Sequence, residues 1–170
     1  MVVTYDCGSE SVNAPVTING IDITSEFTGD VGTYPDAYSS CGLYTTPANS
    51  TWLGVSGPFS FTYIFSIPLN YLTFVLTGAG CPGNENFIFT TDGGGFPTLD
   101  EYGSCYSSVV GNIIYSGLNA CDDPNVGGGG GGVWTVVNSD GPFTRLTISG
   151  DGGQNGTLLA LCPNSIPFIT

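Results

Sequence analysis

Carboxylates are the main side chains in this sequence that could do chemistry. Fourteen Asp and Glu residues stand against one Arg, no Lys and no His, which gives a formal net charge of −13 at pH 7. Arg145 is therefore the only basic side chain, and no residue can act as a general-base histidine or a Schiff-base lysine. A lysine-dependent phosphate loop is excluded. Nucleic-acid binding is not expected, because it relies on clustered Lys and Arg.

Carboxylate catalysis is the one reaction type that this composition still permits. Asp100-Glu101, Asp122-Asp123 and the separate Asp151 could supply the two acids of a glycosidase. Neighbouring residues on a strand point to opposite faces, so the adjacent pairs are poor partners for one substrate. Solvated turn carboxylates explain these residues better, and we expect no catalytic residue and no enzyme activity.

Calcium binding is a second use for some of these acids. Asp122, Asp123 and Asp151 lie in turn sequences rich in oxygen donors and glycine, which suit a hard cation. Their spacing matches neither the EF-hand loop nor the calcium-binding nonapeptide repeat. An Asp beside a Gly is also typical of a tight turn, so calcium is the alternative to plain turns. No other cofactor is expected.

The cysteines favour disulfides in an oxidising environment. They are Cys7, Cys41, Cys81, Cys105, Cys121 and Cys162. None forms a C-x-x-C pair, and no histidine could complete a zinc site. Gly- and Ser-rich surroundings favour two or three disulfides over buried thiols. Many connectivities are open, and pairing of sequence neighbours predicts Cys7–Cys41, Cys81–Cys105 and Cys121–Cys162.

Several aromatic residues are candidates for stacking on sugars. They are Tyr34, Tyr38, Tyr44, Trp52 and Tyr102. Residues 34–44 are rich in Pro, Gly and Ser, which favours an exposed position for their tyrosines. Trp134 lies within an apolar run and is expected in the core instead.

Period-2 alternation dominates the elements that must position these residues. Aromatic residues occupy every second position from Phe59 to Phe65, and 71–77 continues the pattern after Pro68. The two runs are interpreted as neighbouring strands. Further strand signals lie at 16–24, 52–55, 86–91, 105–110, 112–116, 133–138, 144–149 and 157–162, separated by Gly- and Asp-rich turns. We predict one all-β domain over 1–170, an antiparallel, jelly-roll-like sandwich with disulfides.

Three local features add to this prediction. The six glycines at 127–132 are expected to form a flexible surface loop. Residues 158–161 are apolar on both faces, which indicates a central strand or one covered by a neighbouring subunit. Arg145 is out of phase with Leu146 and Ile148, so it should make a surface ion pair or a salt bridge between subunits.

Two segments, FTYIFSIPLNYLTFVLTGAG (61–80) and FTRLTISGDGGQNGTLLALC (143–162), resemble a known group of proteins. They are similar to β-sandwich surface modules of Bacteroidetes and of phages that infect Flavobacterium-like hosts. The resemblance covers about a quarter of the chain and implies a sandwich in a surface setting. It provides no site residue.

The expected function is that of a non-enzymatic surface protein. The N-terminal MVVTYDCGSE has no basic segment followed by an apolar one, so it does not resemble a secretory signal. Cysteines of disulfide type without a signal favour a virion protein that is oxidised after release. We predict a phage spike, fibre or capsid-decorating subunit on the virion surface. It would be a homo-oligomer that contacts other virion proteins and host glycans, without membrane insertion. The alternative is a secreted carbohydrate-binding or adhesin module of a bacterial cell surface.

Overall fold

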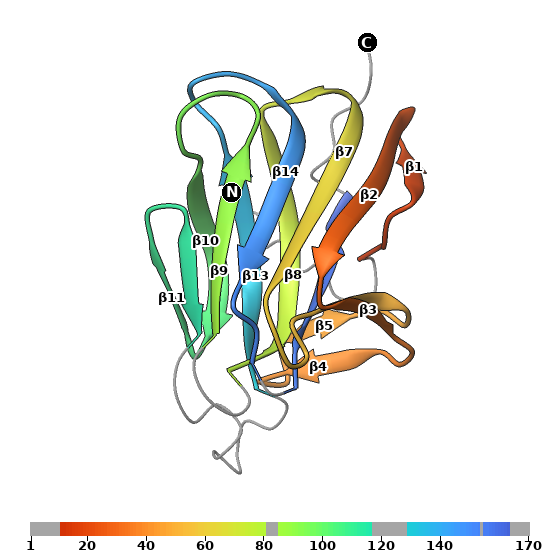
Figure 1. Cartoon of the computed structure of the whole chain (residues 1–170), viewed down its shortest axis with the longest axis vertical. Helices are drawn as coiled ribbons and strands as arrows, with labels where there is room; N and C mark the ends of the chain where they lie inside the picture. The colour runs from red at the N-terminus through yellow and green to blue at the C-terminus, as the bar shows by residue number, and fades with distance from the viewer. Residues whose placement is uncertain (1–10, 81–84, 117–128, 154, 164–170) are drawn as a thin grey trace.

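The computed structural model describes residues 11–80, 85–116, 129–153 and 155–163, and strands make up nearly all of their regular structure (Figure 1). The strands are β1 (Val16–Ile18), β2 (Ile21–Gly29), β3 (Val31–Tyr34), β4 (Tyr38–Ser40), β5 (Tyr44–Thr46), β6 (Ser50–Leu53), β7 (Phe59–Leu69), β8 (Tyr71–Ala79), β9 (Glu85–Thr91), β10 (Thr98–Cys105), β11 (Ser107–Val110), β12 (Ile113–Ser116), β13 (Gly130–Val137), β14 (Phe143–Gly150) and β15 (Thr157–Leu161). Within this part of the chain, no helix is long and apolar enough to cross a membrane.

The strands form two large antiparallel sheets and one small hairpin. The seven-stranded sheet has the order β1-β2-β7-β14-β9-β12-β11, and the six-stranded sheet has the order β10-β13-β8-β15-β6-β3. In Figure 1 the seven-stranded sheet faces the reader, with β8 and β13 behind it. Successive strands from β6 to β10 alternate between the sheets, a jelly-roll-like feature. The predicted all-β sandwich is confirmed.

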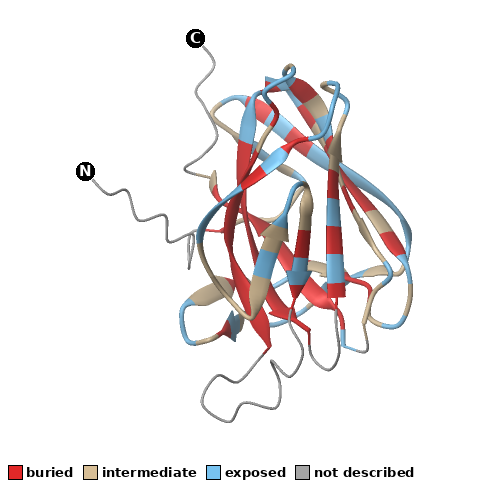
Figure 2. Cartoon of the chain, turned by 90° about the vertical axis from the view of Figure 1, so that its left-hand side faces the viewer, coloured by how far each residue is buried: buried red, intermediate tan, exposed pale blue. Residues whose placement is uncertain are grey.

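One hydrophobic core fills the space between the two sheets. Aromatic side chains dominate it, and the stacked rings of Phe74 in β8 and Phe89 in β9 join the two sheets at a centroid distance of 4.9 Å. Trp134 is fully buried and stacks on Phe74, as expected from the sequence. Figure 2 shows strands that stay buried along their length beside strands whose residues alternate between buried and exposed.

Several strand boundaries differ from the sequence prediction. The predicted strand at 16–24 is a hairpin, because Asn19 and Gly20 both have positive φ and turn the chain between β1 and β2. The strands at 59–67 and 71–77 are not neighbours, since β7 and β8 lie in different sheets. The short polar strands β3, β4 and β5 and the mostly exposed β10 were not predicted, because they lack apolar alternation.

The six-stranded sheet is buried on both faces at its centre. Every residue of β15 is buried, and β15 lies between β8 and β6, which confirms the central strand predicted for 158–161. Its inner face contributes Leu159 and Leu161 to the main core, whereas Ala160 belongs to a second cluster on the outer face. That cluster is covered by Tyr44 of the β4–β5 hairpin.

The prediction of a flexible glycine loop at 127–132 is wrong for the part of this segment that the structure describes. Gly130, Gly131 and Gly132 lie in β13 and are buried. A Cβ on Gly131 would collide with the carbonyl oxygen of Leu76 and would lie 3.2 Å from the Cβ of Ser40 in β4. Glycine is therefore needed here because the β8 backbone comes too close for a side chain, and the hairpin also approaches this position.

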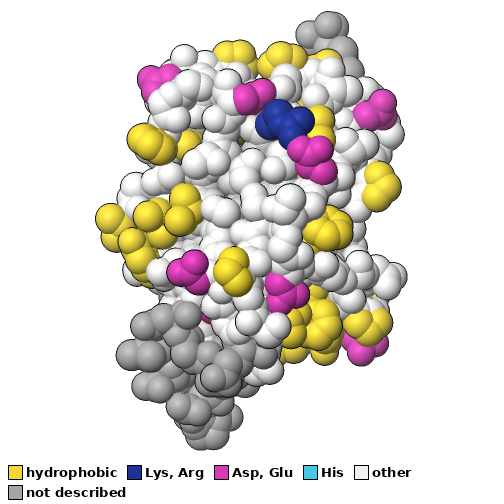
Figure 3. All heavy atoms as spheres, viewed as in Figure 1, with side chains coloured by type: hydrophobic (Ala, Val, Ile, Leu, Met, Phe, Trp, Pro, Cys, Tyr) yellow, Lys and Arg dark blue, Asp and Glu magenta, His cyan; other side chains and the backbone are white. Residues whose placement is uncertain are grey.

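Arg145 makes an ion pair with Glu26 on the outer face of the seven-stranded sheet, and both side chains are partly exposed. Figure 3 shows the single basic side chain beside acidic ones on this face. A surface ion pair within the chain accounts for Arg145, so it gives no support to a salt bridge between subunits. An exposed pair of this kind contributes little stability.

Glu85 is a buried carboxyl that ties the two sheets together at one end of the sandwich. The side chain, at the start of β9, is 3% exposed. Its Oε2 accepts a hydrogen bond from the Gly80 amide at 3.0 Å and another from the Thr157 hydroxyl, while Oε1 is buried and has no partner among the described residues. Burial raises the pKa of Glu85 above its ordinary value, although these hydrogen bonds act to lower it.

Because the folded-state pKa of Glu85 is raised, folding favours the protonated acid. The resulting stability is fully present below the ordinary Glu pKa of about 4.3, and it is lost as pH rises through the folded-state value. We expect Glu85→Gln to reduce the pH dependence of the free energy of unfolding above that point, measured by denaturant titration at several pH values. The exposed Asp36→Asn serves as the control. Equal pH slopes for Glu85→Gln and the unmodified protein would contradict this account.

Candidate functional site

A pocket of about 360 Å³ lies on the outer face of the six-stranded sheet, beside the β4–β5 hairpin. Its lining residues are Tyr34, Tyr38, Trp52, Val55, Gly78, Asn155, Gly156 and Leu158. Strand β3 provides Tyr34, the neighbouring strand β6 provides Trp52, and β4 provides Tyr38. The volume lies within the range of roughly 300–1,000 Å³ that is usual for small-molecule sites. We call this site the aromatic pocket.

Three of the five aromatic residues singled out in the sequence meet in this pocket. The rings of Tyr34 and Trp52 are T-shaped at a centroid distance of 5.1 Å, and those of Tyr34 and Tyr38 are T-shaped at 5.9 Å. Each edge-to-face contact holds one ring in place against the next. The three rings are therefore already arranged before a ligand binds. The pocket therefore offers a rigid aromatic wall.

The loop before β15 fixes the position of Trp52. Its indole Nε1 donates a hydrogen bond of 2.7 Å to the carbonyl oxygen of Asn155. Gly156 has a φ of +75°, and a Cβ there would collide with the same indole nitrogen. Only glycine lets the loop approach so closely. On the other side of Trp52, a Cβ on Gly32 would meet nothing within 4 Å, so the sheet surface is open there.

Among the described residues, no charged side chain lines the aromatic pocket. Its floor is apolar, with the buried Leu158 and the half-buried Val55. Burial raises the pKa of Tyr38, and the neighbouring Tyr34 raises it further, so the Tyr38 hydroxyl stays neutral at ordinary pH. The pocket can therefore pack apolar groups on ring faces and exchange hydrogen bonds with neutral hydroxyls.

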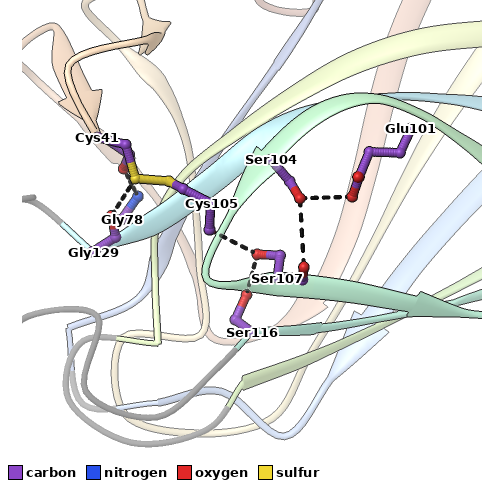
Figure 4. The surroundings of a disulfide bond; sticks show 9 residues. Cys41, Gly78, Glu101, Ser104, Cys105, Ser107, Ser116 and Gly129 are labelled. Atoms are coloured by element: carbon purple, nitrogen blue, oxygen red, sulfur yellow. Dashed lines mark hydrogen bonds between the residues drawn. A yellow bond between two sulfur atoms is a disulfide. The ribbon is translucent and has the colours of Figure 1, made fainter.

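A disulfide and several hydrogen bonds hold the hairpin that provides Tyr38. Cys41 lies next to β4 and is bonded to Cys105 at the end of β10 (Figure 4). The Ser40 hydroxyl accepts a 2.8 Å hydrogen bond from the amide of Gly78, which lines the pocket. The Thr46 and Thr77 hydroxyls share a further hydrogen bond of 2.9 Å. One wall of the pocket thus depends on a hairpin that is fastened to the sheet covalently.

The observed disulfide corrects the predicted pairing. Cys41–Cys105 replaces both Cys7–Cys41 and Cys81–Cys105. The pairing of sequence neighbours failed because the hairpin folds over the sheet and brings Cys41 to β10, 64 residues away. Cys162 is also disulfide-bonded. Its predicted partner Cys121 lies outside the described residues, as do Cys7 and Cys81.

The two remaining aromatic candidates lie on the same face of the six-stranded sheet. Tyr44 packs over the outer cluster of Val75 and Ala160, and Tyr102 lines a second, shallower depression over β8, β10 and β13. Some residues that line the aromatic pocket were not predicted as site residues, among them Leu158, Gly78 and Asn155. The two-faced apolar pattern of 158–161 was the only signal that pointed to one of them.

Of the predicted acidic residues, the structure describes Asp100, Glu101 and Asp151, and these three do not form one metal-binding group. Glu101 accepts hydrogen bonds from the Ser104 hydroxyl at 2.6 Å and from the Trp134 indole at 3.2 Å, while Asp100 lines the depression. Asp122 and Asp123 lie outside the described residues, and Asp151 is exposed after β14. Within the described residues, no three His, Cys, Asp or Glu lie close enough to hold a metal ion. Calcium binding stays a prediction.

Comparison of the chain with protein-family models, curated proteins and solved structures finds no match. The resemblance of residues 61–80 and 143–162 to Bacteroidetes and phage surface modules therefore stays a prediction. Any functional conclusion has to come from the site itself.

Removing the disulfide should loosen the hairpin. We expect the double variant Cys41→Ser, Cys105→Ser to lose up to about 4 kcal/mol of unfolding free energy, because a loop of this length is no longer closed in the unfolded chain. Hydrogen exchange should be faster at the amides of Leu43 and Gly78, which bond to Ser40. Unchanged stability and unchanged exchange at these amides would show that the hairpin does not depend on the disulfide.

Proposed function

We propose that this protein is a non-enzymatic surface protein that binds neutral carbohydrate in the aromatic pocket. The observation that supports this proposal is the set of three edge-to-face rings, Tyr34, Tyr38 and Trp52, around a cavity whose described lining carries no charge. The C–H groups of a sugar ring are slightly positive and pack on the negative face of an aromatic ring. The tyrosine hydroxyls can meet the sugar hydroxyls at the rim.

Charge decides which sugars the pocket suits. The chain has a net charge of −13, and its single cation is paired with Glu26 on the other sheet. Sialic and uronic acids would meet repulsion without a compensating Lys or Arg. Purely apolar ligands would leave the hydroxyls of Tyr34 and Tyr38 without partners. Neutral sugars fit both the apolar wall and the polar rim.

The proposal covers both settings expected from the sequence, a virion subunit that contacts host glycans and a secreted module of a bacterial surface. One observation favours an assembled subunit. An uncharged, largely exposed apolar strip lies at the β11 edge of the seven-stranded sheet, formed by Ile88, Val110, Ile113 and Tyr115, which are neighbours in the strand register. Figure 3 shows hydrophobic side chains gathered at the edge where Figure 1 places β11. We call it the β11 strip.

A second copy of this chain is the occupant that the β11 strip suits. Two chains with a charge of −13 each repel one another wherever their carboxylates meet. The strip lacks carboxylates, and among the described strands β11 lies at the edge of its sheet and pairs only with β12. Antiparallel pairing of two β11 strands would satisfy the open edge and bring the two strips side by side.

Binding should depend on the aromatic wall. We expect Tyr34→Ala to weaken binding of a neutral oligosaccharide about tenfold or more, because one ring contact and its support for Trp52 are lost. Isothermal titration calorimetry with malto-, cello-, manno- and chito-oligosaccharides measures this. Phe96→Ala, at an exposed aromatic residue outside the aromatic pocket and the β11 strip, is the control and should bind normally. Binding that survives Tyr34→Ala unchanged would refute the pocket as the site.

Self-association should depend on the β11 strip. We expect size-exclusion chromatography with light scattering to show a dimer or larger assembly, and Val110→Asp to shift it toward monomer by placing like charges together. Phe96→Asp, at an exposed apolar residue away from the strip, is the control and should leave the assembly intact. A strictly monomeric protein at high concentration would contradict the assembled subunit and leave the secreted module as the setting.

A further inference from the structure

The second depression lies on the same face as the aromatic pocket and has a volume of about 510 Å³. Its lining residues are Asn70, Tyr71, Asp100, Tyr102, Thr135, Val137, Asn138 and Ser139. Two exposed tyrosines mark it, with Tyr71 43% and Tyr102 47% exposed. Large aromatic side chains are costly to leave in water, so a pair at one depression indicates a contact surface. We call it the tyrosine depression.

An unsatisfied acceptor lies at the wall of the tyrosine depression. Asn138 is 3% exposed, and its Nδ2 donates to the carbonyl oxygen of Gly141 at 2.6 Å. Its Oδ1 is buried and has no hydrogen-bond partner within the described residues. Such a group is costly unless a donor reaches it, directly or through a water.

The strand register places the two sites on one diagonal of the outer face. Thr135 at the depression pairs with Thr73 of β8, and Trp52 at the pocket pairs through Leu158 with Thr77 of β8. The sites are thus four residues apart along β8 and three strands apart across the sheet. With about 3.4 Å per residue and about 4.8 Å per strand, their separation is roughly 20 Å.

Tyr44 lies between the two sites. It packs over Val75 and Val133, which are cross-strand partners. Along β8, Val75 lies between Thr73, level with the depression, and Thr77, level with the pocket. Its hydroxyl lies close to Gly103, next to Tyr102, because a Cβ on Gly103 would be 2.7 Å from that oxygen. Burial raises the pKa of Tyr44, and Glu101 raises it further, so the hydroxyl stays a neutral donor. Aromatic residues therefore follow one diagonal from Trp52 to Tyr102.

We infer that the ligand is an extended neutral glycan, which occupies the aromatic pocket with one end and reaches the tyrosine depression with the other. The inference rests on the proposed function and adds to it the length of the ligand and a second subsite. One hexose fills only the pocket, whereas a chain of several units spans the diagonal and contacts Tyr102 and Tyr71. Asp100 at the depression strengthens the selection against anionic sugars.

The test compares ligand length with the variants Tyr102→Ala and Tyr71→Ala. Calorimetry uses malto-, cello-, manno- and chito-oligosaccharides from monosaccharide to hexasaccharide, with the whole protein. In the series that binds, we expect affinity to rise with length. Either variant should weaken hexasaccharide binding about tenfold and leave disaccharide binding unchanged. Both tyrosines are exposed, so the variants should keep the melting temperature of the unmodified protein.

Different failures have different meanings. If a series binds, Tyr34→Ala weakens that binding, and affinity neither rises with length nor falls in Tyr102→Ala, the second subsite is refuted and the aromatic pocket stands. If no series binds at any length, the proposed function fails and the extended site fails with it. A loss of disaccharide binding in Tyr102→Ala as large as that of hexasaccharide binding would also refute the division into two subsites.

Discussion

The apolar outer face of the six-stranded sheet is the constraint on which the rest of the structure depends. A sandwich needs only one apolar face on each sheet, yet Val75, Val133 and Ala160 make this sheet apolar on its outer side too. That surface has to be covered, and the β4–β5 hairpin covers it with Tyr44. The hairpin is too short to extend over the whole face. Where its cover ends, the sheet, the hairpin and the loop before β15 enclose the aromatic pocket.

Scarcity of positive charge shapes what this face can bind. The hairpin is held by a disulfide, neutral hydrogen bonds and close glycine contacts rather than by ion pairs, because the only Arg is used on the other sheet. The same scarcity leaves no cation at either depression on the six-stranded sheet. In the proposed function, recognition would therefore rest on ring faces, hydroxyls and amides, which suit neutral sugars.

Local patterns in the sequence predicted the fold better than the site. Alternation from Phe59 to Phe65 and the two-faced run at 158–161 each indicate a strand without knowledge of its partners. Pairing is non-local, so the placement of β7 and β8 in different sheets and the bond of Cys41 to Cys105 could not be read from neighbours along the chain. The aromatic candidates were found by residue type alone. That Tyr34, Tyr38 and Trp52 share one pocket follows from the register of β3 with β6 and the fold of the hairpin.

Tryptophan fluorescence tests the central claim most directly, because the chain has two tryptophans in opposite environments. Trp52 lines the aromatic pocket, and Trp134 is fully buried between the sheets. Titration with the neutral oligosaccharide that binds should give a saturable change in emission, which persists in Trp134→Phe and disappears in Trp52→Phe. A change that persists in Trp52→Phe, or no saturable change with any neutral oligosaccharide, would contradict carbohydrate binding at the aromatic pocket.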